Sequence, residues 1–142
     1  MGQAIEEFEK HLQENGLKLT GQRRLVVQKA FSMHRHFTAD ELLDISRKAD
    51  KRVSKATVYR TLALLTKYKL LDEHDFGRGS TYYEQMVGYA HHDHLVCLRC
   101  GRIIEFQNDA IEKLQDEVVK EHQFLMLTHS LKLFGLCSLC QR

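Results

Sequence analysis

The chain has 142 residues, of which 43% are hydrophobic and 28% are charged, and its formal net charge is +2. This length allows one or two compact domains, and no apolar run approaches the roughly 20 residues that a membrane-spanning helix needs. Residues 1–15 are acidic and follow a helical pattern, which is not typical of a signal peptide. We therefore expect a cytoplasmic protein, in a reducing compartment where cysteines bind metal more often than they form disulfides.

The first two predicted helices lie before residue 35. Ile5, Phe8 and Leu12 recur at helical spacing, and Gly16 can close that helix with a positive φ angle. Thr20 is suited to cap the start of the second helix. The apolar side chains expected inside the second helix are Leu25, Val26, Ala30 and Phe31.

The third and fourth helices also have recognisable starts. Thr38 and Glu41 form a capping box, which predicts that a helix begins there. Ser54 can cap the fourth helix. The buried stripes expected on these two helices consist of Leu42, Leu43 and Ile45, and of Val58, Leu62 and Leu65.

A hairpin is predicted directly after the fourth helix, because extended runs at 70–76 and 81–85 flank the turn Gly77-Arg78-Gly79-Ser80. Helices followed by such a hairpin indicate a winged helix-turn-helix, whose fourth helix fits the major groove of DNA. Tyr59 and Arg60 lie off the buried stripe, in position to contact bases or phosphates. An outward tyrosine also commonly packs on a neighbouring side chain, and that interpretation stays open.

Basic residues are concentrated in one segment of the chain. Between Lys18 and Arg60 there are eleven Lys and Arg and four Asp and Glu, whereas Gln85 to Arg142 contains six and seven. A local basic excess is typical of a phosphate-binding surface, although a solvated surface gives the same count. The charge therefore agrees with DNA binding by the first half without establishing it.

The second half predicts a small α+β unit of some 50 residues. The expected elements are two strands, a helix that Asn108 caps and a long strand, at 95–97, 102–106, 109–122 and 124–134. The long strand would place His129 in phase with its leucines and therefore bury it. Those leucines are Leu125, Leu127, Leu131 and Leu133. A unit this small needs a cross-link, such as a metal site, in addition to its apolar core.

All four cysteines lie in two CxxC pairs, Cys97 with Cys100 and Cys137 with Cys140. Each pair can aim two thiolates at one point, and two pairs complete the tetrahedral sulfur site that zinc favours. A closed shell of four thiolates leaves no position for a substrate, so we expect a structural zinc ion. Two disulfides or a thiol redox protein are the alternatives, and a redox protein would cycle both pairs without loss of fold.

The run His91-His92-Asp93-His94 is the second chemical feature. In an extended segment, His92 and His94 share one face while His91 and Asp93 share the other. Each pair is half of a nitrogen and oxygen metal site. The candidates to complete these sites are His36, Glu84, Glu105, Glu112 and His129.

Several motifs in fixed order resemble the Fur family of metal-dependent transcriptional repressors, and together they cover nearly the whole chain. They are Gly-Leu-Lys-Leu-Thr-x-x-Arg at 16–23, His-Phe-Thr-Ala-Asp-Glu-Leu at 36–42, Ala-Thr-Val-Tyr-Arg at 56–60, Tyr-Glu at 83–84, His-His-Asp-His-Leu-Val-Cys-x-x-Cys-Gly at 91–101, Ile-Ile-Glu-Phe at 103–106 and Thr-His-Ser-Leu at 128–131. One departure is Gln22, where many members carry proline.

The resemblance implies an α+β architecture: a winged helix-turn-helix DNA-binding domain at 1–86, a hinge at 87–91 and an α/β dimerisation domain at 92–142 stapled by a zinc site of four cysteines. The implied partners are double-stranded DNA with an AT-rich palindromic operator and a second copy of the chain, in a homodimer or a tetramer. Lys18 matches a lysine that enters the minor groove in the family. The residues expected to contact DNA are Lys18, Arg23, Lys55, Tyr59 and Arg60.

The resemblance also assigns the metal ligands. A regulatory site between the domains would consist of His36, Glu84, His92, His94 and Glu105, and an accessory site of His91, Asp93, Glu112 and His129. A shell of histidine and carboxylate suits Fe(II) or Mn(II), whereas a zinc sensor would more naturally use a thiolate. Peroxide-sensing members typically carry aspartate at the position of Glu105.

The expected function is therefore Fe(II)-dependent repression of iron homeostasis genes. Peroxide, manganese or zinc sensing by a member of the same family is the alternative. A metalloenzyme is the alternative from another class, because clusters of histidine and carboxylate also catalyse hydrolysis and oxygenation. No nucleophile or phosphate loop accompanies the clusters, so we expect no enzymatic activity.

Overall fold

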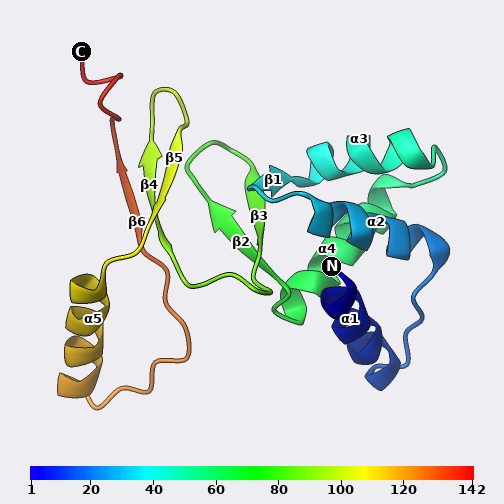
Figure 1. The fold of residues 1–142 in the computed structure, drawn as a ribbon, viewed down its shortest axis with the longest axis horizontal. Coiled ribbons are helices and arrows are strands. Elements are labelled where there is room, and N and C mark those ends of the chain that lie inside the picture. The colour runs from blue at the N-terminus through cyan, green and yellow to red at the C-terminus, as the bar shows by residue number, and fades with distance from the viewer. The chain divides into compact units, whose positions relative to one another are not determined.

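The computed structural model describes residues 1–142, which divide into two compact units, Met1–Tyr89 and Ala90–Arg142. No helix is long and apolar enough to cross a membrane. The first unit contains α1 (Gly2–Glu14), α2 (Gly21–Ser32), β1 (Phe37–Thr38), α3 (Ala39–Ala49), α4 (Lys55–Lys67), β2 (Leu71–Asp75) and β3 (Thr81–Gln85) (Figure 1). The second contains β4 (Asp93–Cys97), β5 (Ile103–Phe106), α5 (Asp109–Glu121) and β6 (Lys132–Gly135).

Local capping fixes where the helices of the first unit begin. The Thr20 hydroxyl accepts a hydrogen bond from the Arg23 amide, and the Ser54 hydroxyl accepts one from the Thr57 amide. At α3 the capping box is complete, because Glu41 Oε2 also accepts from the Thr38 amide at 2.9 Å. These caps satisfy backbone donors that have no partner within the helix. The first helix, α1, has no side-chain cap, but it is present as well, so all four predicted helices are confirmed.

The core of the first unit lies between its four helices and the hairpin. Phe8, Leu12, Val26, Val27, Phe37, Leu42, Val58, Leu62, Leu65, Leu70 and Leu71 are all almost completely inaccessible to solvent. Every predicted stripe contributes to this cluster, although Ile5, Leu25 and Ile45 are only partly buried at its edge. The helices and the hairpin thus form the predicted winged helix-turn-helix.

The sheet of the first unit has the order β1-β3-β2 and is antiparallel throughout. Phe37 pairs with Tyr83, and Asp72 pairs with Glu84 across the hairpin. The two-residue strand β1 was not predicted, because so short a segment has no periodicity to detect. Its pairing with β3 brings His36, which directly precedes β1, next to the strand that carries Glu84.

In the second unit, β4 is the central strand, antiparallel to β5 and parallel to β6. Only Asp93, His94, Val96 and Cys97 are buried, and α5 has no buried residue at all. Asn108 caps α5 as predicted, by accepting hydrogen bonds from the amides of Ala110 and Ile111. This unit therefore has almost no apolar core of its own.

The long strand predicted at 124–134 is wrong. Only Lys132–Gly135 is a strand, and the preceding segment has no regular structure. Leu125 and Leu127 are 80% and 84% exposed, so the leucines at alternate positions do not mark a buried face. His129 is only partly buried, with 24% of its side chain accessible, which also contradicts the expected burial. The segment has no partner strand, and without a ladder alternation alone does not form a strand.

Thr38→Ala should lower the free energy of unfolding of the first unit by about 1 kcal/mol, because it removes the cap of α3. Urea denaturation followed by circular dichroism measures this. Thr66→Ala is the matched control, since the Thr66 hydroxyl only donates back to the Leu62 carbonyl inside α4. Equal stability of the Thr38 variant and the unmutated protein would contradict the capping role.

Candidate metal centres

The four cysteine sulfurs lie within 4.8 Å of one another, and none is in a disulfide. Cys100 Sγ and Cys137 Sγ are 3.8 Å apart. Zinc–sulfur bonds of about 2.3 Å in a tetrahedron place neighbouring sulfurs roughly 3.8 Å apart, whereas a disulfide needs about 2.05 Å. The cluster therefore has the dimensions of a tetrahedral zinc site.

Backbone amides around the cluster already favour thiolates. Hydrogen bonds from the backbone of Cys100 and Cys137 lower the pKa of the Cys97 thiol to about 5. The side chain of Cys137 raises the pKa of the Cys140 thiol to about 12. The pKa of Cys140 is raised because a further thiolate beside the other sulfurs is unfavourable without a cation between them. A bound Zn²⁺ would remove that conflict.

The accessory cluster is also assembled within the second unit. The Nε2 atom of His129 lies 3.1 Å from Glu112 Oε2, and His91 Nε2 lies 3.2 Å from Asp93 Oδ1. His91 Nε2 is 3.4 Å from Glu112 Oε1 as well, so all four ligand atoms fall within 4.8 Å. The cluster draws on the start of β4, on α5 and on the segment before β6.

The environment of Asp93 tests whether this cluster suits a metal. Its side chain is 1% exposed, and neither carboxylate oxygen makes a hydrogen bond. Burying a carboxylate without hydrogen bonds is costly unless a cation compensates it. The donor set of two imidazoles and two carboxylates is one that a divalent metal accepts. The residues therefore fit a metal ion.

The second unit holds three of the five residues predicted for the regulatory site. His94 stands directly opposite Glu105 in the pairing of β4 with β5. His92 Nε2 is 3.7 Å from Glu105 Oε1, and the rings of His92 and His94 are 4.9 Å apart. His91 and Asp93 lie in the accessory cluster instead, so successive side chains of the run 91–94 alternate between two clusters.

The first unit holds the remaining two residues. His36 Nε2 lies 3.4 Å from Glu84 Oε1, and both side chains are largely buried. The pairing of β1 with β3 produces this contact, because it places His36, at the end of the loop before β1, beside β3. A third polar residue, His74 on β2, contacts Glu84 and was missed from the sequence. Its only signal was a histidine in the first strand of the hairpin.

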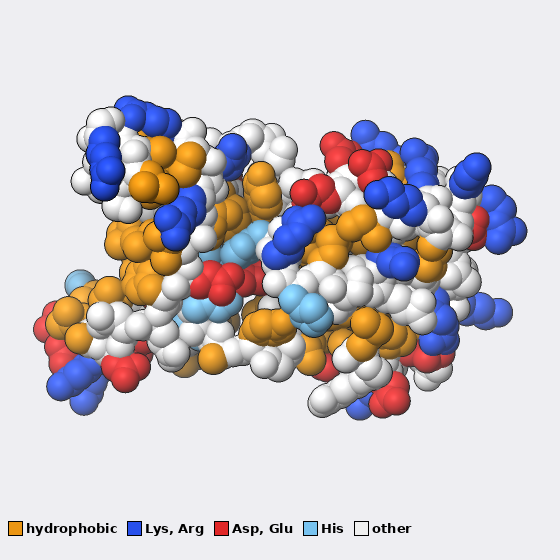
Figure 2. All heavy atoms as spheres, turned by 45° about the horizontal axis from the view of Figure 1, so that its top comes forward, with side chains coloured by type: hydrophobic (Ala, Val, Ile, Leu, Met, Phe, Trp, Pro, Cys, Tyr) orange, Lys and Arg blue, Asp and Glu red, His pale blue; other side chains and the backbone are white.

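The residues predicted to contact DNA lie on or near the start of α2 and α4. Tyr59 is 45% exposed, as predicted, and Lys55 Nζ lies 5.7 Å from the centre of its ring. Arg60 and Lys18 are exposed, whereas Arg23 is partly buried and donates to the Lys18 carbonyl. Figure 2 shows Lys and Arg side chains scattered over the visible surface of the first unit.

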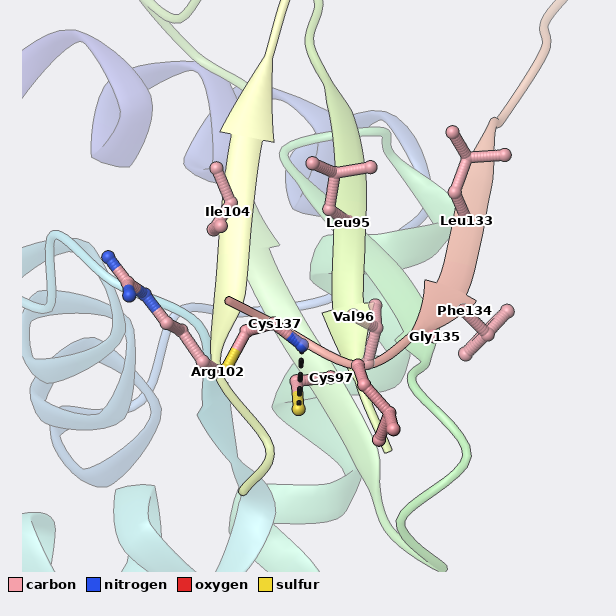
Figure 3. A pocket seen from close by; sticks show the side chains of 10 residues that line it. Leu95, Val96, Cys97, Arg102, Ile104, Leu133, Phe134, Gly135 and Cys137 are labelled. Carbon is pink, nitrogen blue, oxygen red and sulfur yellow. Dashed lines mark hydrogen bonds between the residues drawn. The ribbon is translucent and has the colours of Figure 1, made fainter. Parts of the chain in front are cut away.

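The second unit exposes an apolar row on its sheet. Ile104, Leu95 and Leu133 are neighbours across β5, β4 and β6, and all three are more than a third exposed. Figure 3 shows this row above the Cys97 and Cys137 side chains. Leu114 and Val118 on α5 are exposed as well. We call the row of Leu95, Ile104 and Leu133 the apolar face of the second unit.

Comparisons with known proteins agree on one family. A model of the ferric uptake regulator family matches residues 14–134. The ferric uptake regulation protein of Campylobacter jejuni is 38% identical over 138 residues, which cover 96% of this chain and 87% of that protein. The solved structure of the Helicobacter pylori ferric uptake regulator, described as having three functional metal binding sites, covers 99% of this chain with a TM-score of 0.87 at 35% identity and 93% of its own length. The manganese-containing ferric uptake regulator of Pseudomonas aeruginosa has a TM-score of 0.77 at 33% identity and covers 91% of this chain and 96% of its own.

Cys137→Ser should remove the zinc and lower the melting temperature of the second unit, because binding free energy of a structural metal is folding free energy. Elemental analysis and thermal unfolding measure the two effects. Ser138→Ala changes the same turn without removing a ligand and is the control. A fully loaded Cys137→Ser protein with an unchanged melting curve would rule out the structural role.

Asp93→Asn should act in opposite directions with and without metal. In protein that retains zinc but lacks other metals, it should leave the melting temperature equal or higher, since it removes a buried carboxylate that accepts no hydrogen bond. The rise in melting temperature that added Mn(II) produces should become smaller. Asp109→Asn is the exposed control. A destabilised zinc-only protein with a full Mn(II) response would contradict this account of Asp93.

Proposed function

We propose that this chain, which belongs to the ferric uptake regulator family, represses transcription as a homodimer when Fe(II) occupies a site built by both of its units. The family consists of metal-responsive transcriptional regulators, so the metal identity, the ligands and the operator are the parts that remain proposals. The curated relatives carry the name of ferric uptake regulation at 36–38% identity.

One observation carries the proposal: a histidine and a glutamate, both suited to bind a metal, lie together within the winged helix. His36 Nε2 and Glu84 Oε1 lie 3.4 Å apart within the DNA-binding unit. Two ligands do not complete a coordination shell. The second unit offers a matching partial shell in His92, His94 and Glu105. We propose that these five side chains bind one ion together.

Such a shared shell supports a regulatory role. The ion supplies coordination bonds to side chains of both units and no other chemistry. Ligands contributed by both units would restrict motion of the hinge at residues 87–91 and so fix the orientation of each winged helix. In a dimer, the spacing of two recognition helices must match two half-sites on DNA. Metal affinity and DNA affinity are then coupled by one free energy.

The chemistry of the ligands supports Fe(II) as the physiological metal. All five are nitrogen or oxygen donors, which suit Fe(II) and Mn(II), and the four thiols belong to the sulfur cluster. The names of the curated relatives refer to iron, although the relative from Pseudomonas aeruginosa was solved with manganese. Glu105 in place of aspartate supports iron sensing over peroxide sensing.

The accessory cluster has a different role in this proposal. His91, Asp93, Glu112 and His129 all belong to the second unit, so an ion there can stiffen that unit without reaching the winged helix. With the sulfur cluster, the chain has three groups of ligands. The Helicobacter pylori relative, at 35% identity, is described with three functional metal sites.

The DNA surface would centre on α4. Tyr59 and Arg60 project from this helix, and the cation–π contact of Lys55 with Tyr59 orders both side chains. Lys18 would reach a minor groove or a phosphate, with the segment held by the Arg23 hydrogen bond to its carbonyl. The target would be an AT-rich palindrome, read by the two copies of a homodimer.

The apolar face of the second unit supports dimerisation. Leu95, Ile104 and Leu133 form a contiguous row, and apolar side chains on α5 are also uncovered. Exposed apolar patches of this kind mark protein interfaces. A second copy of the chain is the occupant that the family favours.

The proposal is tested by measuring DNA binding at buffered metal concentrations. Fluorescence anisotropy of an AT-rich palindromic duplex should rise with anaerobic Fe(II), at concentrations where the metal-free protein leaves the duplex unbound. His94→Ala should abolish this response, whereas Asp93→Ala should only weaken it. Tyr59→Ala should lower DNA affinity by about 10–100-fold at unchanged metal content.

Three results would contradict parts of the proposal. DNA binding that does not depend on metal would overturn the corepressor role. Equal loss in the His94 and Asp93 variants would overturn the division into two sites. If Mn(II) or Zn(II) induces DNA binding at a free concentration below that of Fe(II) in cells, that metal replaces iron in the proposal.

A further inference from the structure

One buried histidine belongs to none of the three ligand clusters but contacts a proposed ligand. His74, on β2, is 5% exposed, and its Nε2 atom lies 2.9 Å from Glu84 Oε2. An ionised carboxylate only accepts hydrogen bonds, so the hydrogen sits on Nε2 and His74 donates. This contact lies entirely within the first unit.

The sheet register explains why a donor is needed at this position. Asp72 on β2 stands directly opposite Glu84 on β3. Two carboxylates in this arrangement repel each other. His74 is two residues further along the same face of β2, and its Nε2 is also 3.5 Å from Asp72 Oδ2. The Nε2–H group of His74 therefore lies between two carboxylates and is closer to Glu84.

Aromatic packing holds the His74 ring in one orientation. The ring is stacked on Phe76, with centroids 5.1 Å apart and an interplanar angle of 14°. Its edge meets His36 at 5.8 Å and 81°. Phe76 is fully buried and also contacts the His36 ring edge-on at 5.1 Å. Since the ring cannot rotate freely, the direction of its N–H bond is fixed.

This fixed donor determines which oxygen Glu84 can offer. Glu84 Oε2 is held by His74, while Oε1 lies 3.4 Å from His36 Nε2. One carboxylate oxygen of Glu84 thus accepts the hydrogen bond from His74. The other points toward His36, the neighbouring proposed ligand. The carboxylate is oriented before any ion arrives.

We propose that His74 is a positioning residue for the regulatory site: it orients Glu84 so that a single oxygen is presented to the metal. This inference rests on the proposed function, because it takes Glu84 as a ligand. Hydrogen bonds to ligating carboxylates commonly raise metal affinity by about 10–100-fold. The Glu84 ligand would bind through one oxygen, which limits the coordination number that the site allows.

Two substitutions separate the hydrogen bond from the packing. His74→Phe keeps an aromatic ring against Phe76 and removes the donor. His74→Gln restores an N–H donor at a similar distance from the backbone. Co(II) binding to zinc-loaded protein, followed by its visible absorption in a Glu112→Ala background that disables the accessory cluster, reports affinity without DNA. His74→Phe should weaken Co(II) binding by about 10–100-fold, and His74→Gln should recover most of it.

A double-mutant cycle tests whether His74 acts through Glu84. In Glu84→Ala protein, the further change His74→Phe should have no effect on Co(II) affinity. Persistence of the full loss there would make His74 a ligand in its own right and overturn the inference. So would equal behaviour of the Phe and Gln variants, or an unmutated affinity in His74→Phe.

The same titrations distinguish this inference from the function it rests on. If Glu84→Ala binds Co(II) as tightly as the unmutated protein, Glu84 is not a ligand and the proposed regulatory site is wrong. If Glu84→Ala weakens binding and His74→Phe does not, the site stands and only the role of His74 fails.

Discussion

The sulfur cluster is the interaction on which the second unit depends. That unit buries only Asp93, His94, Val96 and Cys97, and two of these four are ionisable side chains of β4 that belong to other ligand clusters. A segment of this size with so little apolar burial does not hold a fold by hydrophobic free energy alone. Bonds from four thiolates to one ion supply what the core lacks. They connect the ends of β4 and β6, where Cys97 pairs with Gly135.

Strand β4 links the sulfur cluster to the other two ligand clusters, because it contributes residues to all three. Cys97 closes the strand, while His94 and Asp93 at its start belong to two different ligand clusters. Because side chains alternate along a strand, one rigid β4 fixes the direction of both clusters at once. Loss of the sulfur cluster would therefore disturb the two nitrogen and oxygen sites without touching any of their ligands. The structural metal is a precondition for a regulatory one.

The two units differ in what stabilises them. The first has a continuous apolar core and capped helices, so its winged helix does not need a metal to fold. Its sheet instead brings two negative side chains together, because Asp72 and Glu84 are cross-strand neighbours. His74 donates a hydrogen bond to Glu84 at this position. A stable scaffold with an accumulation of negative charge on one face is suited to sense a cation.

Much of this arrangement could be predicted from the sequence. Caps such as Thr38 with Glu41, and stripes such as Val58, Leu62 and Leu65, are local signals and located the helices correctly. The CxxC spacing likewise predicted a cluster that the structure assembles. The strand predicted at 124–134 is wrong over residues 124–131, because leucines at alternate positions do not form a strand where no partner strand exists. His74 was missed since its role comes from the β2–β3 register, which no local pattern encodes.

The central claim is that one metal site couples the winged helix to the second unit. Reciprocity tests it most directly, because coupling between two ligands must be equal in both directions. The measurement is the Mn(II) affinity of the protein with and without saturating operator duplex, by electron paramagnetic resonance of free Mn(II). The account predicts that DNA raises Mn(II) affinity by the same factor by which Mn(II) raises DNA affinity, and that His36→Ala abolishes both factors. An Mn(II) affinity that DNA leaves unchanged would contradict it.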